Sequence, residues 1–129
     1  MGILSVIVNV LLRIRTLTNN KLSYLLYRPP GSPLQLPSTA LAESLSGLQN
    51  ARLLLFAVTG IRKVRWSPKF LLFRDDPSRR DNGKRVLSFY YACALDEAVV
   101  PREENAYWLT SDEFAGEPFY MDHRELLQL

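Results

Sequence analysis

Apolar and polar positions alternate along the N-terminal part of the chain. The apolar positions are Leu4, Val6, Val8, Val10, Leu12 and Ile14, and the other set is interrupted by Ser5, Asn9, Arg13 and Arg15. A period of two over this length predicts a β-strand that is half buried in a sheet. The turn-like segment 16–20 (TLTNN) leads into a second strand-like segment at 21–28 (KLSYLLYR), so the sequence predicts an antiparallel hairpin.

A helix is predicted after a loop. Residues 29–37 (PPGSPLQLP) contain too much proline for a helix and predict a loop. Ser46 and Gln49 have the spacing of a capping box, in which each side chain satisfies a free backbone N–H at the start of a helix. Gly60 suits the position just past the helix, where a left-handed residue is favourable. We therefore expect a helix over 46–59.

Within this predicted helix, residues 53–58 (LLLFAV) carry no polar side chain. A surface helix of a small domain usually keeps one polar face. The run is therefore ordinary core, a membrane segment, or the remains of a site whose polar residues have been lost.

The second half of the chain is predicted to hold more strands than helices. Its expected elements are a β-like segment at 62–74, a polar loop at 75–85, a strand at 86–95, an acidic loop at 96–104, a short strand turning into a helix at 106–114, and a terminal helix at about 121–128. Pro68 should make the first of these bulge, break or lie at a sheet edge. Asn82-Gly83 marks a turn in the polar loop. The strand at 86–95 has its apolar face on alternate residues from Leu87 to Leu95.

Strands thus come before, between and after two main helices, which is typical of an α/β domain with a mixed sheet. The chain has 129 residues and 47% hydrophobic content, enough for one domain with a real core. We therefore expect a single domain over residues 1–129.

The net charge of +3 hides an uneven distribution. Residues 1–74 contain ten Lys and Arg but a single acid, Glu43, which gives +9. Residues 75–129 contain six basic and twelve acidic residues, which gives −6. Such asymmetry indicates an anion-binding half, two lobes that attract each other, or a fold that mixes both halves over its surface.

The N-terminal segment does not have the features of a targeting signal. Its apolar stretch is shorter than the roughly 20 residues that span a bilayer, and it lacks the basic start and the cleavage site of a signal peptide. Val6 stands where a myristoylation signal needs Ser or Thr. The lone cysteine, Cys93, suits a reducing compartment, and no Cys/His cluster for zinc is present in the sequence. We therefore expect a cytoplasmic protein with no membrane partner.

Several stretches, taken in order, resemble the Nudix (MutT-like) superfamily. They are VIVNVLLRI, KLSYLLYRP, QLPST, VLSFYYACAL, YWLTSDEF and DHRELL. In Nudix proteins a strand ending in Trp commonly runs into a turn with the pattern D/E-E-L/F, and a terminal helix then closes the domain. The resemblance covers nearly the whole chain and implies an α/β/α sandwich with a mixed β-sheet.

The resemblance fails in the Nudix box, roughly G-x5-E-x7-R-E-U-x-E-E-x-G-U, where U is apolar. In the family, the glutamates of this helix bind magnesium or manganese, which activates water against a pyrophosphate. With Gly60-Ile61 as the anchor, Leu53 stands at the arginine and Leu54 at the glutamate that follows it. Ala57 and Val58 stand at the Glu-Glu pair. Hydrocarbon side chains offer no oxygen ligand to a hard cation, so no metal or cofactor is expected and ordinary Nudix hydrolysis is disfavoured.

Three functions remain, in order of preference. The first is a non-catalytic module that binds a nucleotide-type ligand, or a protein partner or second copy, through the inherited cleft or the apolar helix face. The second is a divergent hydrolase of nucleoside diphosphate derivatives, using magnesium or manganese and the loop carboxylates Glu103 and Glu104. The third is a small nucleic-acid-binding domain that uses basic residues around Trp66. An unrelated α/β domain in which 53–58 is simply a buried helix is a fourth interpretation.

Residue type and approximate location suggest which side chains would hold a ligand. Arg28, Arg52 and Arg62 are candidates for phosphate contacts, and Tyr90 or Tyr91 for stacking on a base. The family motif does not transfer these roles. The only histidine, His123, lies in the predicted terminal helix, where a structural role is favoured over a catalytic one.

Overall fold

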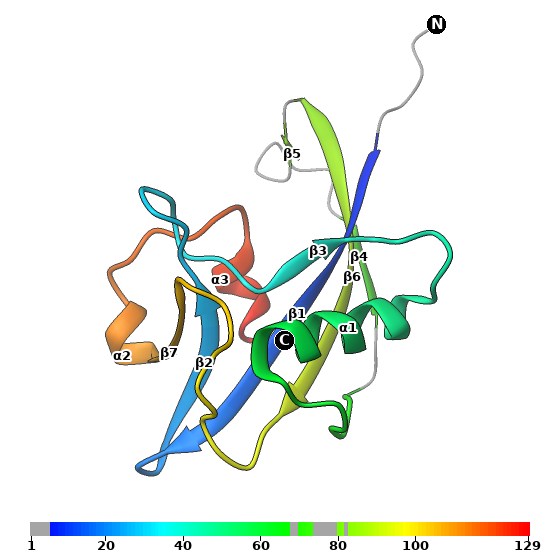
Figure 1. Cartoon of the computed structure of the whole chain (residues 1–129). Coiled ribbons are helices and arrows are strands. Elements are labelled where there is room, and N and C mark those ends of the chain that lie inside the picture. Colours follow the sequence, from blue (N-terminus) through cyan, green and yellow to red (C-terminus); the bar gives the residue numbers. More distant parts are fainter. Residues whose placement is uncertain (1–5, 68–69, 74–79, 82) are drawn as a thin grey trace, which may run out of the picture.

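The computed structural model describes residues 6–67, 70–73, 80–81 and 83–129 (Figure 1). The strands are β1 (Val6–Thr18), β2 (Lys21–Tyr27), β3 (Ser38–Ala40), β4 (Phe70–Phe73), β5 (Arg80–Asp81), β6 (Lys84–Ala94) and β7 (Ala106–Thr110). The helices are α1 (Gly47–Thr59), α2 (Ser111–Phe114) and α3 (His123–Leu126).

Strand β1 is the centre of a mixed sheet. It runs parallel to β6 from Val6, opposite Arg85, to Arg15, opposite Ala94. Along its other side it pairs antiparallel first with β3 and then with β2. The main path through the sheet is β4-β6-β1-β2-β7. The predicted α/β class with a mixed sheet is therefore confirmed.

The prediction that β1 is half buried is wrong over its middle. Val10, Leu12 and Ile14 are fully buried, but so is Leu11 on the opposite face, and Arg13 is only 7% exposed. The reason is that both faces of the sheet are covered: the first three side chains pack with α1, whereas Leu11 packs with residues of α3. The molecule thus has helix, sheet and helix layers.

Helix α1 forms where the capping signals place it. The Ser46 side chain accepts a hydrogen bond from the Gln49 N–H at 3.1 Å, and the Gln49 side chain accepts one from the Ser46 N–H at 2.8 Å. Gly60 has φ +78° and donates its N–H to the carbonyl of Phe56. Both predicted ends of the helix are confirmed.

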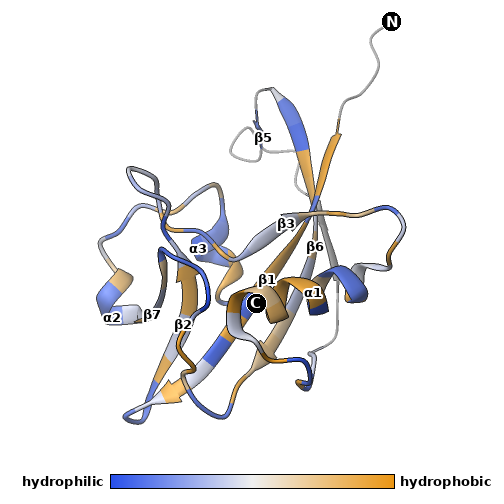
Figure 2. Ribbon diagram, in the orientation of Figure 1, coloured by the Kyte–Doolittle hydropathy of each residue, from blue (hydrophilic) through white to orange (hydrophobic). Residues whose placement is uncertain are grey.

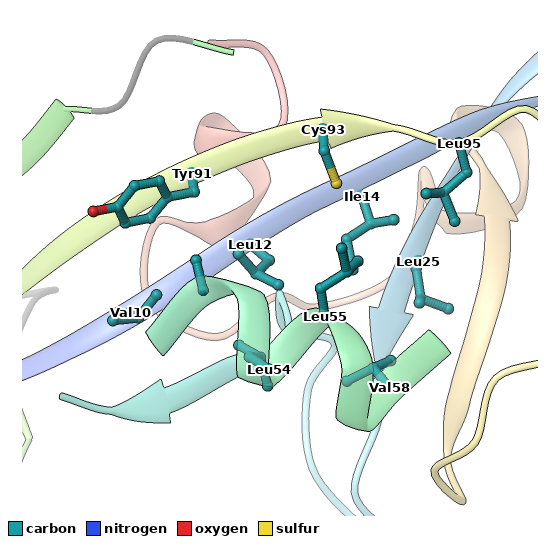
Figure 3. Packing of buried hydrophobic residues seen from close by; sticks show 11 residues of the cluster. Val10, Leu12, Ile14, Leu25, Leu54, Leu55, Val58, Tyr91, Cys93 and Leu95 are labelled. Carbon is teal, nitrogen blue, oxygen red and sulfur yellow. The ribbon is translucent and has the colours of Figure 1, made fainter. Parts of the chain in front are cut away.

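The apolar run in α1 is divided between two environments. Leu54, Leu55 and Val58 are buried, with exposed fractions of 9%, 0% and 3%. Figure 3 shows Leu55 directed at the residues of β1 and β6. Leu53, in contrast, is 59% exposed, and Ala57 is exposed as well. The run is therefore mainly core, and most of its face is covered by the chain itself.

The second core layer lies on the other face of the sheet. It joins Leu11, Tyr90 and Phe114 to residues of the C-terminal segment. The Tyr90 hydroxyl donates to the carbonyl of Leu126 at 2.7 Å, which ties α3 to β6. In Figure 2 hydrophobic colouring runs along the central strands and the middle of α1, whereas the connecting loops are largely hydrophilic.

The other predicted elements agree with the structure to different degrees. The hairpin is confirmed, with its turn at Asn19 and Asn20, which have φ +52° and +63°. Strand β6, and β7 followed by α2, are confirmed. The terminal helix is shorter than predicted, and β3 is a strand that the sequence pattern does not predict. Residues 62–65 form no strand, and Pro68 and Asn82 lie outside the described residues. In the described part of the chain, every helix is too short or too polar to cross a bilayer.

The burial pattern of α1 generates a stability prediction. Leu55→Ala should lower the free energy of unfolding by about 2–5 kcal/mol, because the site is fully buried and a cavity would remain. Leu53→Ala, two residues earlier on the same helix, should change it by less than about 0.5 kcal/mol. Urea denaturation of both variants measures the difference. Equal losses would contradict the orientation of α1 described above.

Candidate functional site

A small cleft lies beside α1. It has a volume of about 240 Å³ and is lined by residues of α1, β2, the 35–38 segment and the loop before β7. The lining residues are Tyr27, Gln35, Pro37, Ser38, Leu54, Val58 and Glu103. Two backbone hydrogen bonds between Tyr27 and Gln35, at 2.8 and 2.9 Å, hold the strand and loop walls together.

The box positions divide between this cleft and the surface. Leu54 and Val58 form the helix wall of the cleft, and Ala57 is exposed outside it. Among the lining residues that the structure describes, Glu103 is the only carboxylate. A magnesium or manganese site for phosphoanhydride chemistry needs several oxygen donors. Hydrocarbon at Leu54 and Val58 with one facing carboxylate does not fit that requirement, and no cluster of three His, Cys, Asp or Glu side chains occurs in the described residues.

Glu103 reaches the cleft because the loop is anchored on both sides of it. The Arg102 N–H donates to the carbonyl of Val58 at 2.7 Å, and the Arg28 N–H donates to the carbonyl of Asn105 at 2.7 Å. Asn105 adopts φ +66°, which turns the chain into β7. Glu103 and Glu104 are both exposed, but Glu104 is not part of the described lining. Of the two predicted carboxylates, the structure thus brings only Glu103 to the box positions.

The same loop covers the C-terminal end of α1. The Arg102 guanidinium carbon lies 5.1 Å from the centre of the Phe56 ring, and that of Arg62 lies 4.2 Å from it. Both are cation–π distances. Phe56 is half-buried as a result.

Three of the predicted ligand residues have structural roles. Arg28 pairs with Glu117 at 2.9 Å. Tyr90 and Tyr91 are 1% and 2% exposed, so neither ring offers a face on which a base could stack. Stacking on these two rings is therefore not supported. Tyr90 is covered by the C-terminal segment on one face of the sheet, and Tyr91 packs in the cluster that contains α1 on the other face.

The other two predicted residues, Arg52 and Arg62, are brought together. They line a hollow of about 520 Å³ with Lys63, Val64 and Trp66. This hollow shares no described lining residue with the cleft.

His123 and Cys93 belong to the core. His123 is 3% exposed, and its Nδ1 accepts a hydrogen bond from the Leu36 N–H at 3.0 Å. Burial raises the pKa of the Cys93 thiol to about 12, an effect that the charge of Arg13 only partly offsets. A thiol that stays protonated at neutral pH is a poor nucleophile.

The chain resembles known proteins in its structure but not detectably in its sequence. No protein-family model matches the sequence, and no curated protein matches it. Solved structures do match: the Nudix domain of Shewanella oneidensis NrtR, in complex with ADP ribose, superposes with a TM-score of 0.77 at 15% identity, over 99% of this chain and 86% of that one. This chain has the Nudix fold.

Two further solved structures are similar in fold and equally distant in sequence. The C-terminal domain of mouse MUTYH, in complex with human PCNA, has a TM-score of 0.72 at 17% identity, over 94% of this chain and 84% of that one. The Caenorhabditis elegans Ap4A hydrolase has a TM-score of 0.65 at 18% identity, over 95% and 92%. The chain spans 58% of the longer NrtR chain that was crystallised with a 27-mer DNA. At these identities the likeness shows the fold, and the function has to be argued from the residues.

The anchoring of the Glu103 loop generates a second prediction. Gly60→Ala should lower the free energy of unfolding by about 1–2 kcal/mol, because φ +78° is unfavourable for alanine. Its Cβ would lie 2.6 Å from Nε of Arg102, so that side chain must also move. Amide hydrogen exchange at Arg102 should become faster. Gly116→Ala is the control, since its Cβ meets nothing within 4 Å; comparable losses in both variants would argue against a special role for Gly60.

The buried thiol generates a third prediction. In the unfolded chain Cys93 ionises near its ordinary value of 9.0, whereas the folded protein keeps the proton until about pH 12. Unfolding therefore releases a proton in this window, and the free energy of unfolding falls as pH rises from about 9. The slope from Cys93 is at most about 1.4 kcal/mol per pH unit. Urea denaturation at pH 8 and pH 10 measures it, and Cys93→Ala should make the slope shallower. An unchanged slope in that variant would refute the assignment.

Proposed function

We propose that this chain is a non-catalytic Nudix-fold module that binds a nucleotide-type ligand. The observation that carries the proposal is the wall of the cleft: Leu54 and Val58 stand where the family places metal-binding glutamates. Without that carboxylate face, the metal that polarises phosphate and activates water has too few donors. The proposal takes residues 1–129 as one module, and the lone buried Cys93 agrees with a reducing, cytoplasmic compartment.

The structural neighbours support binding as the function of such a fold. The NrtR Nudix domain was solved with ADP ribose, and the MUTYH domain with PCNA, so nucleotide ligands and protein partners both occur. A protein partner on α1 is the less favoured of the two here. Most of the apolar face is buried by the chain itself, and Leu53 is the only exposed large hydrophobic side chain of that helix.

A divergent hydrolase is the second candidate, and the position of Glu103 favours it. This carboxylate lies in the cleft opposite Leu54 and Val58, where a base or a single metal ligand would be useful. An enzyme of this type would depend on magnesium or manganese and on Glu103.

Metal titration and a turnover assay separate the two candidates. The purified protein is titrated with magnesium and manganese by calorimetry, and phosphate release from ADP ribose and Ap4A is followed with phosphatase coupling. We expect no metal binding in the micromolar range and no turnover above the protein-free control.

Matched variants make the test specific. If turnover is seen, Glu103→Gln should abolish it. Glu104→Gln is the matched control: it makes the same chemical change one residue away, outside the described cleft lining, and should keep turnover. Metal-dependent turnover that is lost in the first variant and kept in the second would overturn the non-catalytic proposal.

A further inference from the structure

The hollow that contains Arg52 and Arg62 lies apart from the cleft. It is formed by the exposed side of α1 and the segment that follows Gly60, and has a volume of about 520 Å³. Its described lining is Arg52, Arg62, Lys63, Val64 and Trp66. This volume is within the range of small-molecule sites.

The charge of this hollow is entirely positive among the described residues. Arg52, Arg62 and Lys63 are all exposed. Within the described part of the chain, no carboxylate pairs with any of these three cations. The ion pairs there involve other cations, in Lys21–Asp112 and Arg28–Glu117. Three cations around one concave surface attract an anion, and guanidinium groups match the geometry of phosphate oxygens.

Two of the side chains are held in place before any ligand arrives. The Arg62 guanidinium lies over the Phe56 ring at 4.2 Å. Trp66 packs edge-to-face against Tyr91 with ring centres 6.1 Å apart, and it forms a β-bridge with Cys93. Its indole is half-buried, so part of it remains accessible. Fixing these groups in advance lowers the entropy cost of binding.

We propose that this hollow binds a nucleotide unit, with its phosphate on Arg52, Arg62 and Lys63 and its base against Trp66. Cations beside an aromatic platform are the elements of sequence-tolerant recognition of single strands. A neighbouring hollow shares Lys63 and Val64 and adds Arg65, so the basic surface continues past one nucleotide. Asp96 and Glu97 also line that second hollow, so its charge is mixed. The inference goes beyond the proposed function, because it does not depend on whether the cleft is catalytic.

The test measures binding of a short fluorescein-labelled oligothymidylate to the full chain by fluorescence anisotropy. We expect saturable binding at low salt that weakens as salt rises. Arg52→Ala and Lys63→Ala should each weaken binding by about tenfold and reduce the slope of log K against log salt by about 0.7. Lys21→Ala, which removes one exposed charge from the hairpin, should leave binding nearly unchanged. Denaturation midpoints confirm that each variant is folded.

Intrinsic fluorescence gives a second, independent readout. A base against Trp66 should quench its emission, so Trp66→Phe should lose the quench while Trp108→Phe keeps it. Competition with unlabelled thymidine monophosphate shows whether the hollow prefers a free nucleotide or a strand. If the monophosphate displaces the labelled oligothymidylate completely at concentrations near the dissociation constant of the monophosphate, the ligand is a free nucleotide. If it displaces the oligothymidylate only weakly, the ligand is a strand. Absence of binding by both probes at low salt, or equal weakening in Lys21→Ala, would overturn the proposal.

Discussion

Burial of one face of α1 against β1 and β6 is the contact on which the rest of the structure depends. Leu55 fills the space between the helix and the central strands, and it meets residues from β1, β2 and β6 in one cluster (Figure 3). An isolated helix of this length is marginal in water, so most of its stability has to come from this packing. The capping box and Gly60 define where the helix begins and ends, and the apolar stripe defines how it is rotated on the sheet.

The rotation of α1 decides the chemistry of the cleft. It points Leu54 and Val58 toward the loop that holds Glu103, and it leaves Arg52 and Leu53 on the outside. Hydrocarbon on the cleft side strengthens the core but leaves a single carboxylate among the described lining. Leu54 and Val58 thus belong to both the core and the wall of the cleft.

The basic residues of the first half of the chain fall into two groups in the structure. Some cations of the first half pair with acids of the second, as in Lys21–Asp112 and Arg28–Glu117. Exposed pairs of this kind contribute little to stability. Arg52, Arg62 and Lys63, however, gather around Trp66 without a described carboxylate partner. The paired cations and the cations of the proposed anion site are therefore different residues.

The sequence by itself determined the local elements, because their signals are local: the period of two in β1, the capping box at Ser46, and Gly60 after the helix. It also indicated the Nudix fold and predicted apolar residues at the box positions. Only the tertiary structure decided which side chains are accessible. Leu11, Tyr90 and Tyr91 are buried, because α3 covers one face of the sheet and α1 the other, and such contacts between distant segments leave no periodic trace in the chain. For the same reason only the fold separated Glu103 from Glu104, and only the fold placed Arg52 beside Arg62 and Trp66.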